Sequence, residues 1–413
     1  MNWIDSTVGE YCPFVYGKGL PKTKRQVGEH PVYGSNGCVD YHNDFFIDGP
    51  GLIIGRKGSV GAVHLSEVPF WPIDTAFYVK KETLGELRFT FYLLRSLGLE
   101  KMNSDSAVPG LNRDNAHALL IRIPATESER EALGNKLALL DQKIGLNNKT
   151  NQTLEEMAQA IFKSWFVDFD PVKAKMNGEE PEGMDAATAS LFPEKLVESE
   201  LGLIPEGWDV GTLDSHTSMI IDHRGKTPKK LGSDWVEQGY PAISAKNIKS
   251  KKIVRPDTIR FLDETTYKKW MKEPLVKGDI IMTSEAPMGE LYFFDGSQDF
   301  CLSQRLYGLR ANSDVCNPVF LFDWLQTIQA KADMEGRASG STVLGIKQAE
   351  LRKVKILTPP KDILDKYSSI VSNLIDMTAK NNAQNISLEK LRDTLLPKLL
   401  SGEIELAEII VME

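Results

Sequence analysis

Lysine and arginine gather in two stretches of the chain that are also rich in turn-forming residues. Cationic side chains and the N–H groups of glycine-rich turns hold DNA phosphates, and arginine can also read guanine. These residues could therefore contact a nucleic acid. The first cluster consists of Lys18, Lys22, Lys24 and Arg25 around a Gly-Lys-Gly-Leu-Pro turn, with Arg56 and Lys57 in a second turn at residues 55–61. The second cluster consists of Arg224, Lys226, Lys229, Lys230, Lys246, Asn247, Lys249, Lys251 and Lys252.

The net charge of −8 does not exclude such a partner, because the charge is unevenly distributed. Residues 177–206 carry eight acidic residues against one lysine, and residues 401–413 add four glutamates, so the rest of the chain is mildly positive. A local basic surface is what phosphate contact requires. For any single residue of the clusters, a solvated surface charge is an equally good explanation. Their recurrence in both halves of the chain favours DNA contact for the set.

No catalytic centre is evident in the sequence. We find no GxxxxGK[ST] phosphate loop, no HExxH or GxSxG motif, and no asparagine-led motif of an amino-methyltransferase. The turn at residues 55–61 resembles a nucleotide-binding glycine turn but lacks the strand–turn–long helix context. Because the four cysteines are far apart in the chain, we expect reduced thiols and no zinc site. These cysteines are Cys12, Cys38, Cys301 and Cys316.

The chain consists of two related halves. Residues 108–124 align with residues 343–359, and residues 147–166 align with residues 381–400. Earlier in each half, residues 3–8 match 208–213 and residues 51–54 match 278–281. With 413 residues, 41% of them apolar, the chain can form two globular domains. Two similar domains on one chain indicate a pseudo-symmetric protein that engages its target in two places.

Each half is predicted to end in a long helix. From residue 133 to 165 and from 367 to 399, mostly apolar residues recur at alternating steps of four and three, which is a heptad seam. Each seam is interrupted by two asparagines, Asn147 and Asn151 in the first and Asn381 and Asn385 in the second. If the helices pair antiparallel, these asparagines face one another and fix the register. Packing of each helix on its own domain is the alternative.

These observations predict an α/β (α+β) fold with two mixed globular domains separated by two long helices in an antiparallel coiled coil. A 33-residue helix is about 50 Å long, so the pair could hold two domains at a fixed separation. In domain 1, strands are predicted at residues 51–54 and 76–79 and a helix at 84–97. The predicted segments are domain 1 (1–124), a central helix (125–168) with Thr126 and Glu129 as its capping box, an acidic linker (169–203), domain 2 (204–360), a C-terminal helix (361–402) and an acidic tail (403–413).

The sequence shows no sign of secretion or of a membrane span. The first residues lack a basic start followed by an apolar run. No stretch approaches the roughly 18 apolar residues that a membrane helix needs. We therefore expect a soluble, cytoplasmic protein with no membrane partner.

Several motifs, in this order, resemble those of the DNA-specificity (S) subunit of type I restriction-modification systems. In the first half they are residues 31–37 (PVYGSNG) and 55–58 (GRKG). In the second half they are residues 204–208 (IPEGW), 240–248 (YPAISAKNI), 345–351 (GIKQAEL) and 395–402 (LLPKLLSG). The resemblance covers nearly the whole chain. Each motif is moderately specific alone, and the ordered set with its two-fold repeat is highly specific.

The resemblance implies two target-recognition domains, each reading one half of a split, asymmetric DNA sequence, with the helix pair as a ruler between them. Residues 33–37 read Tyr-Gly-Ser-Asn-Gly where residues 243–247 read Ile-Ser-Ala-Lys-Asn, so the two half-sites are expected to differ. The polar residues of these motifs become further candidates for DNA contact: Tyr33, Ser35, Asn36, Ser59 and Ser244.

The resemblance also implies that the chain is not an enzyme and binds no cofactor itself. Its expected partners are double-stranded DNA, a pair of adenine methyltransferase (M) subunits and restriction (R) subunits. S-adenosylmethionine, ATP and Mg are expected on those partner subunits. Phe162, Trp165 and Phe166 are candidates for docking the M subunits, although packing within the helix pair or on their own domain explains them equally well.

Two other functions are compatible with the sequence. A non-enzymatic coiled-coil scaffold that binds protein or glycan would leave the basic clusters as solvated surfaces. An enzyme with an unrecognised site would have to be active without partners. A salt titration separates DNA binding from the scaffold, because DNA affinity falls steeply as salt rises.

Overall fold

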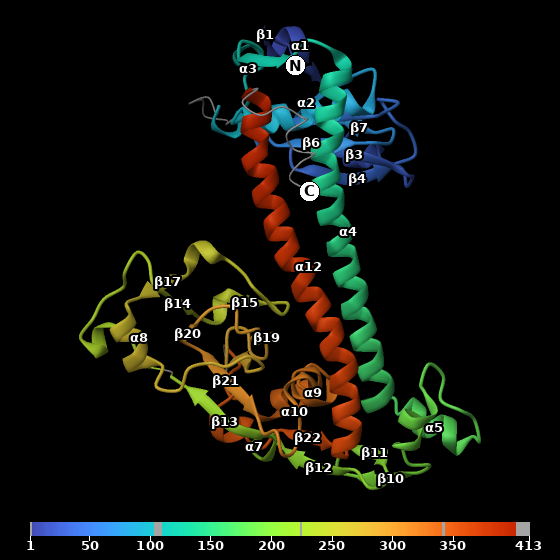
Figure 1. The fold of residues 1–413 in the computed structure, drawn as a ribbon, viewed down its shortest axis with the longest axis vertical. Helices are drawn as coiled ribbons and strands as arrows, with labels where there is room; N and C mark the ends of the chain where they lie inside the picture. Colours follow the sequence, from blue (N-terminus) through green and yellow to red (C-terminus); the bar gives the residue numbers. More distant parts are fainter. Residues whose placement is uncertain (1, 103–109, 224, 341–342, 402–413) are drawn as a thin grey trace. The chain divides into compact units, whose positions relative to one another are not determined.

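The structure, a computed structural model, describes residues 2–102, 110–223, 225–340 and 343–401. Arg224 and the predicted acidic tail 403–413 lie outside the described residues. The chain divides into two compact units: unit 1 comprises residues 1–151 and 379–413, and unit 2 comprises residues 152–378. The two long helices, α4 (Glu127–Phe166) and α12 (Lys361–Ser401), each contribute to both units (Figure 1).

Unit 1 contains a four-stranded sheet in the order β2-β8-β5-β6 and a three-stranded sheet in the order β4-β3-β7. All neighbouring pairs are antiparallel except β3 and β7, which are parallel. A two-stranded ribbon joins β1 to β9. The strands are β1 (Trp3–Thr7), β2 (Val15–Tyr16), β3 (His30–Gly34), β4 (Gly37–His42), β5 (Gly51–Gly55), β6 (Val63–Ser66), β7 (Trp71–Pro72), β8 (Ala76–Val79) and β9 (Leu120–Pro124).

The core of unit 1 lies between the four-stranded sheet and its helices. The apolar face of α2 packs there with Leu133 and Leu137 of α4 against Ile54 and Phe77 of the sheet. The strands predicted at residues 51–54 and 76–79 and the helix predicted at 84–97 are confirmed. The helices are α1 (Val8–Tyr11), α2 (Leu84–Ser96) and α3 (Arg113–His117), with short 3-10 turns η1 (Lys22–Lys24) and η2 (Leu99–Lys101).

Unit 2 repeats the strand order of unit 1. Its sheets run β13-β21-β18-β19 and β17-β14-β20, and β12 pairs with β22 as β1 pairs with β9. The parallel pair β14 and β20 occupies the same place as β3 and β7. The duplication visible in the sequence is therefore a duplication of topology. The strands are β12 (Asp209–Thr212), β13 (Thr217–Asp222), β14 (Tyr240–Ile243), β17 (Arg260–Leu262), β18 (Ile280–Thr283), β19 (Leu291–Phe293), β20 (Cys301–Leu302), β21 (Leu306–Ala311) and β22 (Lys355–Thr358).

Unit 2 also contains elements that have no counterpart in this strand order. These are the hairpins β10 (Leu196–Ser199)–β11 (Gly202–Pro205) and β15 (Ile248–Lys249)–β16 (Lys252–Ile253), with helices α5 (Asp170–Met176) and α6 (Ala186–Ser190). The remaining helices are α7 (Leu213–His216), α8 (Glu264–Trp270), α9 (Pro318–Trp324), α10 (Ile328–Arg337) and α11 (Gln348–Leu351), with 3-10 turns η3 (Lys229–Leu231), η4 (Ala245–Asn247) and η5 (Pro256–Thr258).

The segment predicted as an acidic linker, 169–203, is folded against unit 2. It contains α5, α6 and β10, and its Val172 and Phe192 are fully buried in the unit 2 core. Phe192 packs edge-on against Trp165 at 5.2 Å between ring centroids. The segment is ordered although it is rich in acidic residues, because the apolar side chains of Val172 and Phe192 anchor it in the core.

The heptad seams are confirmed as the buried faces of α4 and α12. Every described seam position, from Leu133 to Trp165 and from Tyr367 to Leu395, is buried or half-buried. In unit 1 the two helices run in opposite directions, because Asp141 of α4 contacts Arg392 of α12 while Asn151 contacts Asn381. The helix pair is therefore antiparallel there, as predicted.

The expected capping box of α4 is half formed. The N–H of Glu129 donates to Oγ1 of Thr126 at 3.4 Å, as predicted. The Glu129 carboxylate, however, accepts from the Thr126 hydroxyl (2.8 Å).

The proposed docking residues Phe162, Trp165 and Phe166 are buried, with at most 6% of each side chain exposed. They pack around Tyr367 of α12 at centroid distances of 5.0–6.1 Å. The docking assignment is therefore wrong for this arrangement, and the alternative, packing within the helix pair and the unit 2 core, holds. Their large apolar side chains are buried within the protein.

Candidate nucleic-acid interface

Three loops of unit 1 are joined by backbone hydrogen bonds. They are residues 34–36 after β3, residues 55–61 at the end of β5, and residues 73–75 between β7 and β8. The N–H of Ile73 donates to the Tyr33 carbonyl, and the N–H of Arg56 donates to the Thr75 carbonyl, both at 2.9 Å. We call these three loops the loop edge of unit 1.

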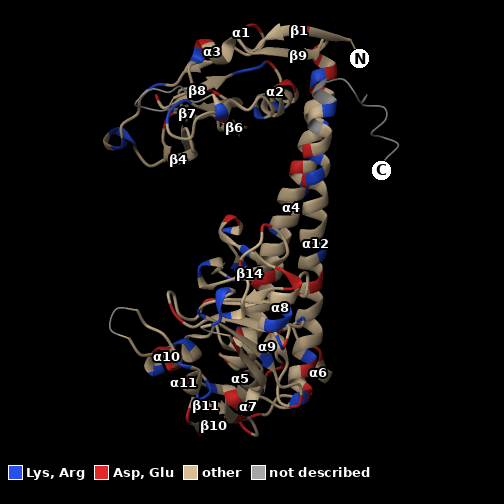
Figure 2. Ribbon diagram, turned by 90° about the vertical axis from the view of Figure 1, so that its left-hand side faces the viewer, with Lys and Arg blue, Asp and Glu red and all other residues tan. Residues whose placement is uncertain are grey.

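The same three loops and the same bonds recur in unit 2, at residues 244–246, 283–289 and 303–305. The N–H of Ser303 donates to the Ile243 carbonyl (2.8 Å), and the N–H of Ser284 donates to the Arg305 carbonyl (2.9 Å). We call these loops the loop edge of unit 2. This correspondence places Asn36 at the position of Lys246, as the comparison of residues 33–37 with 243–247 assumed. Lysine and arginine recur on the loops of both units (Figure 2).

On the loop edge of unit 1, Asn36 and Lys57 are exposed. Ser59 Oγ donates to Oδ1 of Asn36 at 3.3 Å, so the two predicted residues form one polar group. The Arg56 guanidinium lies 5.1 Å from the ring centroid of Tyr16 and donates to the Asp74 carbonyl. These four predicted residues are brought together.

Two further residues that lie beside this edge were not predicted. Tyr16 is 48% exposed, and Arg113 of α3 places its guanidinium 5.1 Å from the same ring. Both arginines are thus within cation–π range of one aromatic ring. Tyr16 directly precedes the first basic turn, so an aromatic residue beside lysines was a usable signal. Nothing in the sequence connects Arg113 to Tyr16.

Arg25 and Ser35 are wrong as DNA contacts in this conformation, because both side chains are used internally. The Arg25 side chain is 8% exposed; its Nε and Nη2 donate to the Leu20 carbonyl, and its Nη1 donates to Asp40. Ser35 is buried; its hydroxyl donates to the Thr75 carbonyl and accepts from the N–H of Lys57. Both stabilise the loops that carry the exposed residues.

The other predicted residues of unit 1 are peripheral to the loop edge or partly buried. Tyr33 packs edge-on against Phe70 at 5.8 Å, and burial raises its pKa. Lys18 is exposed, with its ammonium 5.3 Å from the ring centroid of Phe46. Lys22 and Lys24 are exposed on η1. The lysines remain available for phosphate contact.

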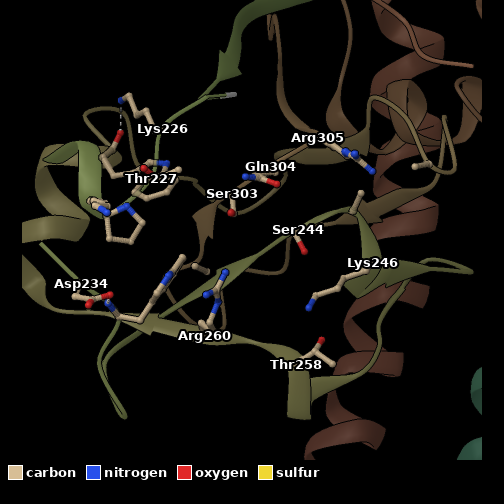
Figure 3. Close-up of a pocket in the computed structure, with 17 residues that line it drawn as sticks. Lys226, Thr227, Asp234, Ser244, Lys246, Thr258, Arg260, Ser303, Gln304 and Arg305 are labelled. Carbon is tan, nitrogen blue, oxygen red and sulfur yellow. Dashed lines mark hydrogen bonds between the residues drawn. The ribbon is translucent and has the colours of Figure 1, made fainter. Parts of the chain in front are cut away.

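A cavity of about 570 Å³ opens at the loop edge of unit 2. Four predicted residues line it, namely Lys226, Lys229, Ser244 and Lys246. Residues that were not predicted complete the lining, among them Trp235, Arg260, Gln304 and Arg305 (Figure 3). Against these five cationic side chains, Asp234 is the one acidic residue of the described lining.

The cavity's cationic groups differ in how free they are. Lys226 donates from Nζ to the Trp270 carbonyl at 2.8 Å, and burial lowers its pKa. The Arg260 guanidinium lies 4.1 Å from the ring centroid of Trp235. Lys229 and Lys246 are exposed. The exposed pair suits phosphate contact, whereas Lys226 helps to hold the cavity wall.

Asn247 is wrong as a base-reading residue, because its side chain is fully buried. Its Oδ1 accepts from the Ser244 N–H and hydroxyl, and its Nδ2 donates to Thr258 Oγ1. Asn247 therefore shapes the turn that presents Lys246. Ser244 is correspondingly committed to this turn.

The remaining predicted lysines of unit 2 lie on a hairpin and on η3. Ser250 and Lys251 form the two-residue turn between β15 and β16, and Lys251 pairs with Glu155 of α4. Lys249 and Lys252 lie opposite each other on the two strands and are exposed. Lys230, exposed on η3, donates from Nζ to the Gly225 carbonyl. Lys251 is thus engaged in fixing the hairpin to α4.

Among the described residues no group of His, Cys, Asp and Glu is arranged to hold a metal ion. The four cysteines are free thiols, and burial raises the pKa of Cys12, Cys301 and Cys316 to about 12. No helix in the described part of the chain combines the length and apolar character that crossing a membrane demands.

Comparison with known families decides the assignment. The family described as "Type I restriction modification DNA specificity domain" matches residues 1–156 and 205–390, one segment in each half. The chain belongs to this family. The two matched segments correspond to the two repeats of the topology, each with its long helix.

Known members of this family resemble the chain over most of its length. The specificity subunit of the type I restriction enzyme HindI from Haemophilus influenzae is 27% identical over 72% of this chain and 71% of that protein. The specificity subunit of MjaIX from Methanocaldococcus jannaschii is 26% identical over 78% of this chain and 70% of that protein.

A solved S subunit shares the fold. The crystal structure of the type I restriction-modification S subunit from M. genitalium superposes with a TM-score of 0.62, covering 97% of this chain and 96% of that one. At 17% identity this likeness concerns the fold alone.

Proposed function

We propose that the chain is the DNA-sequence recognition subunit of a type I restriction-modification complex and reads a bipartite, asymmetric target. Each unit reads one half-site with its loop edge. The observation that carries this proposal is that one topology occurs twice with different exposed side chains at equivalent loop positions. Asn36 and Lys57 in unit 1 stand where Lys246 and Glu285 stand in unit 2.

Exposed and half-buried cationic residues hold the phosphate backbone. Lysine acts as a point charge toward phosphate, and arginine beside an aromatic ring adds a planar donor. In unit 1 these groups are Lys57, Arg56 and Arg113, and in unit 2 they are Lys229, Lys246 and Arg260. Phosphate contacts position the protein, and the polar side chains between them read bases.

In this proposal the chain performs no catalysis. It positions two adenine methyltransferase subunits, and through them restriction subunits, on the DNA. S-adenosylmethionine, ATP and Mg belong to those partners. The lengths of α4 and α12 set the number of base pairs between the half-sites, and the four asparagines Asn147, Asn151, Asn381 and Asn385 fix the register of the helices.

The test is a domain exchange read by methylated-adenine mapping. Residues 1–124 are replaced by those of a family member with a different target, and the full complex is expressed in cells that lack other methyltransferases. One half-site should change while the other half and the spacer stay the same. A target in which both halves are unchanged, or both altered, contradicts the assignment of one half-site to each unit.

The scaffold alternative gives a different result in a salt titration. If the complex neutralises several phosphates, the logarithm of DNA affinity falls linearly with the logarithm of salt concentration, with a slope of about −0.9 for each contact. A scaffold for protein or glycan shows no such DNA affinity at any salt concentration. No observation on this chain favours the scaffold.

A further inference from the structure

The loop edge of unit 2 carries an ion pair where unit 1 carries a lysine. Arg305 Nε lies 2.9 Å from Oε1 of Glu285, and the two side chains are 52% and 40% exposed. An ion pair this exposed contributes little to stability, because solvent screens it. The stability of the fold therefore does not account for the pair.

The backbone that carries the pair is fixed on both sides. The N–H of Ser284 donates to the Arg305 carbonyl (2.9 Å), the N–H of Ile346 donates to the Ser284 carbonyl (3.0 Å), and Glu285 forms a β-bridge with Gly345. Arg305 itself has a φ of 65°, in the left-handed region. A non-glycine residue keeps this conformation only where its surroundings impose it, and such residues cluster at binding sites. The loop therefore holds Arg305 in a backbone conformation that is unfavourable in free energy.

Arg305 also lines the cavity of unit 2, next to Gln304 on the same loop (Figure 3). Both residues are exposed, and the loop that bears Lys246 lies beside theirs. The side chains differ in type from the lysines around them. Arginine pairs with O6 and N7 of guanine, glutamine pairs with adenine, and glutamate accepts from N4 of cytosine. Lysine more often anchors phosphate.

We propose that Glu285, Gln304 and Arg305 read bases in the half-site of unit 2; this inference rests on the proposed function. Arg305 donates to O6 and N7 of a guanine, and Glu285 accepts from N4 of a cytosine. Because one G·C pair presents both edges in the major groove, the preformed Arg–Glu pair is complementary to it. Gln304 reads a neighbouring base pair.

Unit 1 has different residues at these three positions. Lys57 stands at the position of Glu285, and Asp74 and Thr75 stand at the positions of Gln304 and Arg305, as the shared hydrogen bonds define them. The charge at the first position is reversed. The two units therefore present different side chains at equivalent positions of one scaffold, which is what an asymmetric target requires.

The test uses the full chain in complex with its methyltransferase partner, in cells, with methylated adenines mapped across the genome. R305K keeps a positive charge but lacks the two-pronged donor geometry. We expect R305K and E285A to relax the preference for the same G·C pair on the order of 10- to 100-fold, in one half-site only. Q304A relaxes an adjacent position. The matched control is K268A, which breaks the exposed Lys268–Glu264 pair of α8 in the same unit and leaves the target unchanged.

A second measurement guards against variants that fail to fold. The complex is titrated with a duplex that carries the mapped target and with the same duplex altered at the single G·C pair. The inference is supported if a variant no longer discriminates between the two duplexes but keeps the melting temperature of the wild type. Discrimination retained in both R305K and E285A overturns it. A wild-type complex that directs no sequence-specific methylation contradicts the proposed function itself, whereas an unchanged target in the variants contradicts only this inference.

Discussion

Asn147 donates from Nδ2 to Oδ1 of Asn385 at 2.8 Å, and Asn381 donates to Asn151 at the same distance. Since Asn147 is aligned with Asn381, and Asn151 with Asn385, one bond occurs twice, related by the repeat of the chain. The flanking bonds repeat as well: Asn385 donates to Asn148, and Asn151 donates to Asn382, both at 2.9 Å. A polar network of this symmetry forms in one alignment of the helices, because a shift of either helix separates the partners.

The network predicts that removal of one asparagine lowers the free energy of unfolding, whereas removal of both partners lowers it little. Asn385→Leu removes one of the two acceptors of the buried Asn147 Nδ2, the other being Gln384 Oε1, and also the donor to Asn148. The variant should destabilise the protein by about 1–3 kcal/mol. The double variant N147L/N385L should regain much of this stability, because apolar residues suit a heptad seam. The midpoint of urea unfolding measures both. Asn373→Leu, on the exposed face of α12, is the control, and equal midpoints for the single and double variants would contradict the prediction.

A second group of polar contacts connects three helices in unit 1. Arg392 of α12 donates to Asp141 of α4 at 2.6 Å, and the hydroxyl of Tyr92 on α2 donates to the same carboxylate at 2.6 Å. Arg392→Ala leaves the half-buried Asp141 without its cation and should cost about 1–3 kcal/mol of unfolding free energy. Lys353→Ala, which breaks an exposed pair with Glu350, should cost less than about 1 kcal/mol. If the two variants lowered the melting temperature by similar amounts, the contacts of Asp141 would contribute little to stability.

In unit 2 the buried carboxylate of Asp323 predicts a pH dependence of stability. Burial raises its pKa to about 6, although the hydroxyl of Tyr367, at 2.5 Å, and the nearby Lys251 favour the charged form. Because an unfolded aspartate titrates at about 3.9, the folded state binds an extra proton between these values. This group's contribution to stability therefore falls as the pH rises from about 4 to 6, by up to about 3 kcal/mol.

Comparison of Asp323→Asn with the wild type isolates this effect, since other groups titrate alike in both proteins. The variant should be more stable than the wild type at pH 7, and the difference in melting temperature should shrink as the pH falls towards 4. A difference that stays constant over this range would refute the assignment.

Lys57 and Arg25 were both predicted to contact DNA. In the structure Lys57 is exposed, whereas the Arg25 side chain is buried. Lys57→Ala should weaken DNA binding about equally on all sequences and reduce the slope of the salt dependence by about one. Arg25→Ala should leave that slope unchanged and lower the melting temperature, because the guanidinium holds Leu20 and Asp40. Titration of each complex at several salt concentrations gives the slopes. The reverse outcome, a changed slope for R25A alone, would mean that this loop opens on DNA.

The spacing between half-sites should follow helix length. Removing seven residues from each helix, 152–158 and 374–380, keeps the seam on one face and leaves all four register asparagines in place. Each helix shortens by about 10 Å, which corresponds to about three base pairs of B-DNA at 3.4 Å each. Methylation mapping should show both half-sites unchanged and a shorter spacer. An unaltered spacer would show that the helices do not set it.

The sequence by itself determined the duplication, the two long helices and their asparagine register. These features depend on local periodicity: a heptad seam needs only its own residues to reveal which face is buried, and two asparagines at matched positions identify their partners once the helices are antiparallel. The equivalence of residues 33–37 with 243–247 was also correct, because the N–H of Ile73 donates to the Tyr33 carbonyl where the N–H of Ser303 donates to the Ile243 carbonyl.

Only the tertiary structure decided which polar residues face solvent. Asn247 and Arg25 carry the right chemistry for DNA, but the side chain of each donates to carbonyl groups of a neighbouring turn. Trp165 and its neighbours looked available for a partner until the folded segment 169–203 covered them. Glu285 and Arg305, 20 residues apart, become a pair only where two strands of one sheet end together. Local pattern predicts elements, whereas burial and pairing depend on contacts between elements, which no short stretch of sequence contains.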